Sequence, residues 1–244
     1  FADVVKVSIP AAIHVLILIA EKDLGGALIF YITYIVILYA ATRKEGYILL
    51  GAGALAAGAA AAYKLFYHVR VRVAAWKDPW SDVANKGYQV TQSLFAIGTG
   101  GWFGMGLCEG TPQKIPVSKT DFIFSAICEE MGVFFGLCII LVEISCFVMF
   151  INISLKINSR FYKLTALGLS VEYMFQTFLT IGGVTKFIPS TGVTLPLVSY
   201  GGSSVTSTMI LFAIIQGLYV KNSGRGEIGE TDGKRQRRSR RNEE

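Results

Sequence analysis

Long apolar runs separated by short polar turns dominate the hydrophobic pattern of this chain. A helix needs about 20 apolar residues to cross about 30 Å of hydrocarbon, because it rises about 1.5 Å per residue. Six stretches reach or nearly reach that length, and they are residues 5–20, 24–42, 46–66, 131–153, 162–185 and 203–220. The pattern therefore predicts an all-α integral membrane protein, a polytopic helical bundle with about six transmembrane helices.

Two polar segments lie outside these runs. Residues 67–120 form a long insertion between the third and fourth runs, and residues 221–244 follow the sixth. The last segment is rich in arginine and lacks apolar periodicity, a composition that is typical of disorder. We expect a transmembrane domain over residues 1–220, with the insertion 67–120 as a long loop, and a basic disordered tail over residues 221–244.

The composition supports this class. Hydrophobic residues make up 52% of the chain and charged residues 16%, and the mean hydropathy is +0.51. Soluble domains contain about 25% charged residues. The chain begins at Phe1, and its opening segment is too short and wrongly flanked for a signal peptide, so we expect further spans to precede it.

Basic residues in the short loops predict the orientation. They fall before the third span, before the fifth span and after the sixth, at Arg43, Lys44, Lys156, Arg160, Lys163 and in the tail. The positive-inside rule makes that side cytoplasmic. The loop 67–120 and the polar stretch before the last span then face outward. The net charge of +6 reflects topology and attraction to anionic lipids, and no nucleic-acid partner is expected.

Cysteine and histidine spacing gives no metal or disulfide pattern. The four cysteines are scattered without a CxxC pair and without a nearby histidine, at Cys108, Cys128, Cys138 and Cys146. We expect them to be ordinary apolar residues.

Charged residues interrupt the apolar runs at a few places. Glu21 and Asp23 lie in the run IAEKDLGG between the first two spans. One straight helix through this region would be too long for the bilayer, so the run marks an outer turn. A loop that pairs its own charges and a functional site remain equally open here.

The stretch TDFIFSAICEEMG leads into the fourth span. At about 100° per helical residue, Ser125, Cys128 and Gly132 fall on the side of Asp121. This stripe of small residues leaves room for a partner helix or a substrate, and a carboxylate above it suits a general base. Asp121 fits equally well as a helix N-cap.

Basic residues of the loop are candidate partners for acidic groups. Glu129 and Glu130 are expected to pair with basic side chains. Arg70 and Arg72 suit an anionic head group, because arginine binds phosphate through a planar fork of donors. The alternative is that these arginines snorkel at the interface, with Trp76 and Trp80 as aromatic belt residues.

Two glycine-rich stretches need separate explanations. GYQVTQSLFAIGTGGWFGMGLCEG has only a weak similarity to phosphate-binding loops. IPSTGVTLPLVSYGGSS, before the last span, is expected to be a folded re-entrant loop beside the outer cavity, because irregular backbone at membrane depth must be buried or face water. Its glycines permit unusual backbone conformations, and two of its serines, Ser203 and Ser204, suit a helix cap. The residues assigned structural or cavity roles here are Pro189, Gly192, Pro196, Ser199, Tyr200, Gly201, Gly202, Ser203 and Ser204.

Together these stretches resemble the SEDS family (shape, elongation, division and sporulation), which includes FtsW, RodA and SpoVE. The similarity covers nearly all of residues 18–220 and rests on EKDLGGALIF, VRVRVAAWKDPW, GYQVTQSLFAIGTGGWFGMGL, TDFIFSAICEEMG, QTFLTIGGVT and STGVTLPLVSYGGSS. The sequences of these stretches are most similar to those of FtsW-like members. Family members have about ten spans, so the resemblance implies that about four precede this chain.

The resemblance implies a peptidoglycan glycosyltransferase that polymerises lipid II on the outer face of the bacterial cytoplasmic membrane, for cell division or cell shape. It implies that Asp121 is catalytic and deprotonates the acceptor sugar while undecaprenyl diphosphate leaves. Expected substrate-binding residues are Arg70, Arg72, Gln89, Gln92, Lys119 and Gln176. A divalent cation, Mg²⁺ or Mn²⁺, is a candidate cofactor, but the sequence identifies no ligands for it.

The resemblance also implies partners and rivals. A class B penicillin-binding protein, which is a transpeptidase, and other divisome or elongasome membrane proteins are the expected partners. The main alternative function is a lipid II flippase, for which Glu143 and Glu172 supply the only charges at depth, and a third is a scaffold that recruits the transpeptidase.

The chain departs from the family pattern at two places. The run before Thr120 is Pro116, Val117, Ser118 and Lys119 instead of Pro-Glu-x-His, and Thr180 replaces an asparagine. We therefore expect no role for a glutamate or histidine just before Thr120, and Lys119 becomes the candidate phosphate contact.

Overall fold

The computed structural model describes the main chain of residues 2–241 and the side chains of residues 4–222. Helices are its only regular elements within this part of the chain. In order they are α1 (Ala2–Ala20), α2 (Leu24–Thr42), α3 (Gly46–Leu65), α4 (Tyr67–Lys77), η1 (Pro79–Asp82), α5 (Tyr88–Gly100), η2 (Pro112–Lys114), α6 (Ile123–Lys156), α7 (Arg160–Val184) and α8 (Gly202–Arg241).

The expected membrane-spanning helices are present. Five of them are long and apolar enough to cross a bilayer, namely α2, α3, α6, α7 and the part of α8 over Gly202–Asn222. The first expected span is the shorter apolar helix Val4–Ala20 within α1. The prediction of a multi-pass helical bundle is confirmed. The main chain of the predicted tail continues α8 as a helix to Arg241, and its disorder stays a prediction.

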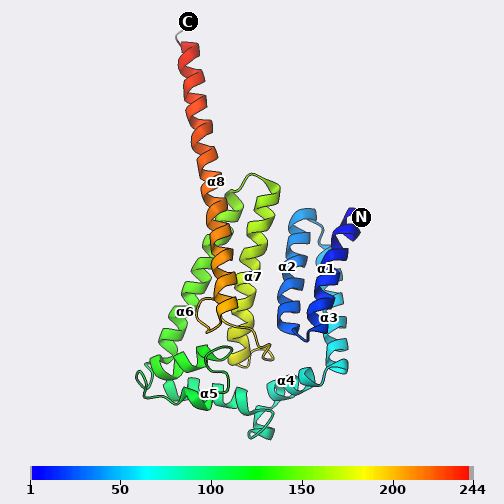
Figure 1. Ribbon diagram of the computed structural model, residues 1–244, viewed down its shortest axis with the longest axis vertical. Coiled ribbons are helices and arrows are strands. Elements are labelled where there is room, and N and C mark those ends of the chain that lie inside the picture. Colours follow the sequence, from blue (N-terminus) through cyan, green and yellow to red (C-terminus); the bar gives the residue numbers. More distant parts are fainter. Residues whose placement is uncertain (1, 242–244) are drawn as a thin grey trace.

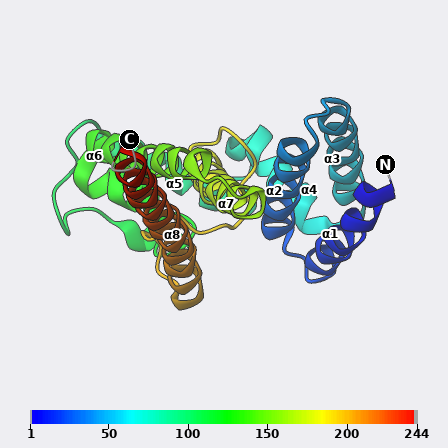
Figure 2. The same cartoon turned by 90° about the horizontal axis from the view of Figure 1, so that it is seen from above.

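Two groups of three helices stand side by side (Figures 1 and 2), α1 to α3 in one and α6 to α8 in the other. Small residues bring them together. A side chain at Gly168 of α7 would meet Ile37 of α2, and one at Gly51 of α3 would meet Ile35 of α2. Tyr31 of α2 also donates a 2.8 Å hydrogen bond to the Gly51 carbonyl. Helix α2 therefore links α3 to α7.

The two ends of the bundle carry different segments. The α2–α3 turn, the α6–α7 turn and the C-terminal end of α8 lie at one end of the bundle in Figure 1, whereas α4, α5 and the loop 185–201 lie at the other. The basic residues Arg43, Lys44 and Arg160 thus share an end, as the sequence predicted.

Helix α6 is broken at Gly132, whose φ of 86° and ψ of 163° are not helical. The loop after α5 pairs with this break. The Met105 N–H donates to the Glu129 carbonyl at 2.9 Å, and the Val133 N–H donates to the Gly101 carbonyl at 2.9 Å. Residues 123–131 therefore form a separate helical piece before the long span.

The same pairing explains the glycines of the loop. A side chain at Gly104 would collide with the Glu130 carbonyl, and one at Gly132 would collide with the Trp102 carbonyl. Both glycines also have positive φ. Close backbone approach therefore accounts for Gly104 and Gly132.

Two buried clusters form the core of the second helix group. One joins α5, the start of α6, the end of α7 and the loop 185–201 through Ala96, Ile115, Phe122, Phe124, Cys128, Val184 and Leu195. The other joins α6, α7 and α8 through Phe150, Ile153, Ile157, Ala166, Tyr173, Leu211 and Ile215. The first cluster supports the candidate site directly.

Candidate active site

Asp121 lies in the turn before α6 and not inside that helix. The N-cap of α6 is Phe122, and no side chain caps the helix there. The N-cap interpretation of Asp121 is therefore wrong. Asp121 is partly buried.

Arg72 and Asp121 converge at Gly192. A Cβ atom placed on Gly192 would lie 3.0 Å from Nη2 of Arg72 and 3.5 Å from Oδ2 of Asp121. Gly192 has a φ of +79°, which disfavours any side chain, and it is exposed. The exposed backbone of Gly192 thus lies against one guanidinium and one carboxyl group, with no room for a side chain between them.

The environment tunes the proton affinity of the carboxyl group. Burial raises the pKa of Asp121 above its ordinary value, while a hydrogen bond from Thr120 and the charge of Arg72 lower it by less. An aspartate in this setting accepts a proton more readily than an exposed one does.

Helix α4 holds Arg72 in place. Nη1 of Arg72 donates to the Thr191 carbonyl at 2.7 Å, and Nε1 of Trp76 donates to the Lys186 carbonyl at 3.2 Å. These side chains are about one helical turn apart, so both face the loop 185–201. Trp76 therefore holds this loop through a hydrogen bond. The interpretation of Trp76 as an aromatic belt residue did not include this contact.

Arg70 does not join the site. Because α4 is helical, residues two positions apart point in nearly opposite directions. Arg70 is exposed and its guanidinium lies 5.8 Å from the ring centroid of Tyr67. The expected pair of arginines is thus reduced to Arg72.

Helix α7 fixes the loop from the other side. Gln176 donates to the Thr194 carbonyl at 2.9 Å, and Thr180 donates to the Val193 carbonyl at 3.0 Å. Gln176 was expected to bind substrate, but its amide nitrogen is used to hold the loop. Thr180, the departure from the family pattern, shares this task.

The end of the loop reaches the segment before Asp121. The Ser199 hydroxyl donates to the Thr120 carbonyl at 2.7 Å, and the Tyr200 N–H donates to the Lys119 carbonyl at 2.8 Å. Lys119 itself is exposed. The folded loop expected from the sequence is present, with Leu195 and Pro196 buried and Pro189 partly buried.

Four residues of the stretch SYGGSS differ from expectation in detail. Gly201 and Gly202 do not have positive φ. Because α8 begins at Gly202, Ser203 and Ser204 lie in its first turn and do not precede it. Ser204 instead shares a 2.8 Å hydrogen bond with Thr194. The glycine that needs special backbone freedom is Gly192.

The small-residue stripe beside Asp121 is filled by protein. Ser125 shares a 2.6 Å hydrogen bond with Ser93 of α5, and Ser93 donates to the Val184 carbonyl at 2.8 Å. Ser125, Cys128 and Gly132 are all buried. The stripe therefore receives a partner helix and not a substrate.

The other acidic candidates have surroundings of their own. Asp23 caps α2 by accepting the Gly26 N–H at 2.8 Å, and Glu21 is exposed in the same turn. Glu129 is buried and accepts the Thr111 N–H at 3.2 Å, which corrects the expectation of a basic partner. Glu130 is partly buried beside Gly110.

Helix α5 carries the two remaining polar candidates. Gln89 is exposed and Gln92 is partly buried. Neither side chain forms a hydrogen bond to Arg72 or Asp121 in the described part of the chain. Their assignment as substrate-binding residues stays a prediction.

The residues present do not fit a protein-held metal ion. Among the side chains of residues 4–222, no group of three or more His, Cys, Asp or Glu residues could hold one. Asp121 instead has a guanidinium as its charged neighbour.

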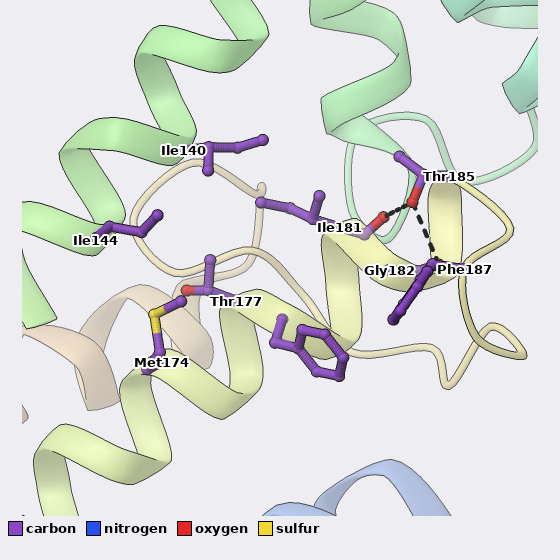
Figure 3. A pocket seen from close by; sticks show the side chains of 9 residues that line it. Ile140, Ile144, Met174, Thr177, Ile181, Gly182, Thr185 and Phe187 are labelled. Atoms are coloured by element: carbon purple, nitrogen blue, oxygen red, sulfur yellow. Dashed lines mark hydrogen bonds between the residues drawn. The ribbon is translucent and has the colours of Figure 1, made fainter.

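A separate apolar pocket of about 270 Å³ lies between α6 and α7. Ile140 and Ile144 of α6 point toward Met174 and Thr177 of α7 (Figure 3), and Phe187 closes one side. Asp121 and Arg72 do not line this pocket. It offers apolar surface but no acid or base.

Sequence reasoning missed several positioning residues. Trp76, Thr180 and Ser93 each donate to a carbonyl of the loop or of the end of α7. Their only sequence signal is a polar atom within an otherwise apolar helical face. That signal names no partner, because the partners are backbone carbonyls far away along the chain.

Comparisons with known proteins agree with this architecture. The FtsW/RodA/SpoVE family model, described as "Cell cycle protein", matches residues 2–224. A solved structure described as "Structural coordination of polymerization and crosslinking by a peptidoglycan synthase complex" aligns with a TM-score of 0.72 and 25% identity, covering 88% of this chain and 61% of that one.

Curated relatives are similar over most of this chain. Peptidoglycan glycosyltransferase RodA of Mycobacterium tuberculosis (strain ATCC 25618 / H37Rv) is 41% identical over 203 residues, 83% of this chain and 43% of the relative. Probable peptidoglycan glycosyltransferase FtsW of Geobacter sp. (strain M18) is 34% identical over 219 residues, 87% of this chain and 58% of the relative. These identities do not support the expected closeness to FtsW-like members.

The chain spans about half the length of the curated relatives that it matches. The family match nevertheless covers nearly the whole chain, and the helices, the Asp121 turn and the loop 185–201 follow the order expected from the motifs. The chain belongs to the FtsW/RodA/SpoVE family.

Proposed function

We propose that the full-length protein is a peptidoglycan glycosyltransferase that polymerises lipid II into glycan strands, for cell division or cell-shape maintenance. The relatives that carry this activity in their names support the proposal. The observation that carries it is the convergence of the Asp121 carboxyl group and the Arg72 guanidinium at the exposed residue Gly192.

Asp121 acts as the general base. Its carboxylate takes the proton from the acceptor sugar hydroxyl, whose oxygen attacks the anomeric carbon of the donor. The bond from that carbon to the diphosphate oxygen breaks, and undecaprenyl diphosphate leaves with the bonding electrons. A raised pKa strengthens the carboxylate as a proton acceptor near neutral pH.

Arg72 stabilises the charge that develops on the diphosphate. Its Nη1 donates to the Thr191 carbonyl, while Nη2 lies beside Gly192 on the side of Asp121. A donor fixed before the reaction stabilises a developing anion without reorganisation. The docking of α4 on the loop 185–201 therefore supports catalysis.

The site faces the outer side of the bacterial cytoplasmic membrane in this proposal. Arg43, Lys44 and Arg160 lie at the end of the bundle opposite the site (Figure 1). Short basic loops are retained in the cytoplasm. The C-terminus is then cytoplasmic, and the site meets lipid II from the outer leaflet.

A class B penicillin-binding protein is the proposed partner. The similar solved structure belongs to a complex whose description names both polymerization and crosslinking. Strands made here would be crosslinked by such a transpeptidase. Other divisome or elongasome membrane proteins are proposed partners by family membership alone.

The flippase alternative is less well supported by the geometry. Glu143 is buried and accepts a hydrogen bond from Thr177 at 3.3 Å, so it joins α6 to α7. Glu172 is partly buried on α7. A carboxyl group fixed between two packed helices does not line a path for a lipid head group.

The test is polymerisation of fluorescent lipid II by the full-length protein together with its transpeptidase. Asp121→Asn is expected to abolish long glycan strands, because the amide cannot accept the proton. Glu21→Gln, an exposed carboxyl group at the same end of the bundle, is the matched control and is expected to leave synthesis intact. Normal strands from a folded Asp121→Asn variant would overturn the proposal.

A further inference from the structure

The loop that pairs with the α6 break exposes large apolar side chains. Trp102 is 68% exposed and Phe103 is 88% exposed, and Met105 and Leu107 are also exposed. No charged residue occurs between Lys86 and Glu109 in the sequence. We propose that residues 102–107 form an interfacial anchor that inserts into the lipid leaflet at the site end of the bundle.

The anchor has a fixed position along α6. The Gly106 N–H donates to the Glu130 carbonyl at 3.0 Å, and the Phe134 N–H donates to the Trp102 carbonyl at 3.2 Å. The side chains therefore project from a rigid backbone at the point where the long membrane span begins. A flexible loop could fold its apolar side chains back onto the protein, but this one is held by the break.

The exposed surface continues onto the span. Phe134, Leu137 and Leu141 of α6 are exposed, and their spacing places them on one face of the helix. This face and the loop form one apolar surface, and the span requires lipid around it. Lipid is therefore the occupant that continuity favours, and Trp and Phe suit the boundary between head groups and acyl chains.

The anchor sets the depth of the reaction site. Two of its backbone bonds, from the Met105 and Gly106 N–H groups, end on Glu129 and Glu130, which lie in the short helical piece directly after the Asp121 turn. Fixing the loop at the lipid boundary fixes the height of that turn above the leaflet.

Site-directed spin labelling of the full-length protein in phosphatidylglycerol and phosphatidylethanolamine liposomes tests the proposal. Each variant carries a single label, at Phe103→Cys in one and at Leu107→Cys in another. In each variant all other accessible cysteines are replaced by serine. Exposed Gln113 in η2, as Gln113→Cys, is the aqueous control, and native exposed Cys138 on α6 is the hydrocarbon control.

The measurement is the ratio of the label's collision rate with molecular oxygen to its collision rate with a water-soluble nickel complex. This ratio is expected to be several-fold higher for both anchor labels than for the label at 113. Their ratios should approach that of the label at 138. A nickel-dominated ratio at both sites would place the loop in water and overturn the proposal. Labels shielded from both reagents would show another protein segment or partner on the surface, which also overturns it.

Discussion

The Ser199 hydroxyl joins the loop before α8 to the Thr120 carbonyl, the residue next to Asp121, through a 2.7 Å hydrogen bond. The same oxygen accepts the Leu195 N–H at 2.8 Å. Ser199 is only 3% exposed, so water cannot replace either bond easily. One buried hydroxyl thus connects the folded loop to the chain segment that positions the carboxyl group.

Substituting Ser199→Ala is expected to lower kcat/KM for lipid II polymerisation by about 10- to 100-fold, because small misplacement of a catalytic group is costly. It should also destabilise the protein by about 1–3 kcal/mol, since a buried N–H and a carbonyl lose their partner. The control is Ser203→Ala, an exposed serine of the same motif. Equal activity of the two variants would contradict a positioning role for Ser199.

The pH dependence of polymerisation should report Asp121. A general base must be deprotonated, so the rate falls as pH decreases through its pKa. Burial raises the pKa of Asp121, and the Arg72 charge lowers it. In Arg72→Gln the positive charge that lowers the pKa of Asp121 is lost. The fall of the rate on the acid side of the profile should therefore occur at higher pH. The pH profile of kcat/KM measures this, and an acid limb that stays in place would argue against the assignment of the base.

Arg70 and Arg72 should differ in effect despite their closeness in sequence. Arg72→Lys is expected to lower kcat by about 10²-fold, the usual cost of one lost donor to a developing anion, because lysine lacks the planar fork. Arg70→Lys should leave kcat nearly unchanged, since Arg70 is exposed and its guanidinium lies beside the Tyr67 ring. Steady-state kinetics of the two variants compare them directly. Similar losses would mean that both arginines reach the substrate.

Two glycines on neighbouring helices should respond oppositely to alanine. Gly132→Ala forces a side chain into the Trp102 carbonyl at a positive φ, with a strain cost of about 1–3 kcal/mol before any clash. Gly98→Ala lies within α5 with open space around it, and it should stabilise by about 0.5–1 kcal/mol. Thermal unfolding in detergent checks both signs. A Gly132→Ala variant as stable as the wild type would show that the loop can move away.

Much of the fold was predictable from the order of residues alone. The spans are visible because crossing a bilayer demands a minimum length of apolar side chains, and α2, α3, α6, α7 and α8 occupy the predicted stretches. The position of Asp121 just before a span was equally visible. Its alternative role as an N-cap depends on where the helix begins, and α6 begins at Ile123, two residues after Asp121.

The sequence by itself determined which segments enter the membrane, which polar segments remain between them and which carboxyl group lies before the fourth long run. Only the tertiary structure decided that Arg72 and not Arg70 meets Asp121, because that choice depends on the helical twist of α4. It also decided that α6 breaks at Gly132 and that Ser199 bonds the Thr120 carbonyl. The α6 break and the Ser199 bond both involve backbone groups that are distant along the chain from their partners, and a backbone carbonyl carries no signature in the sequence.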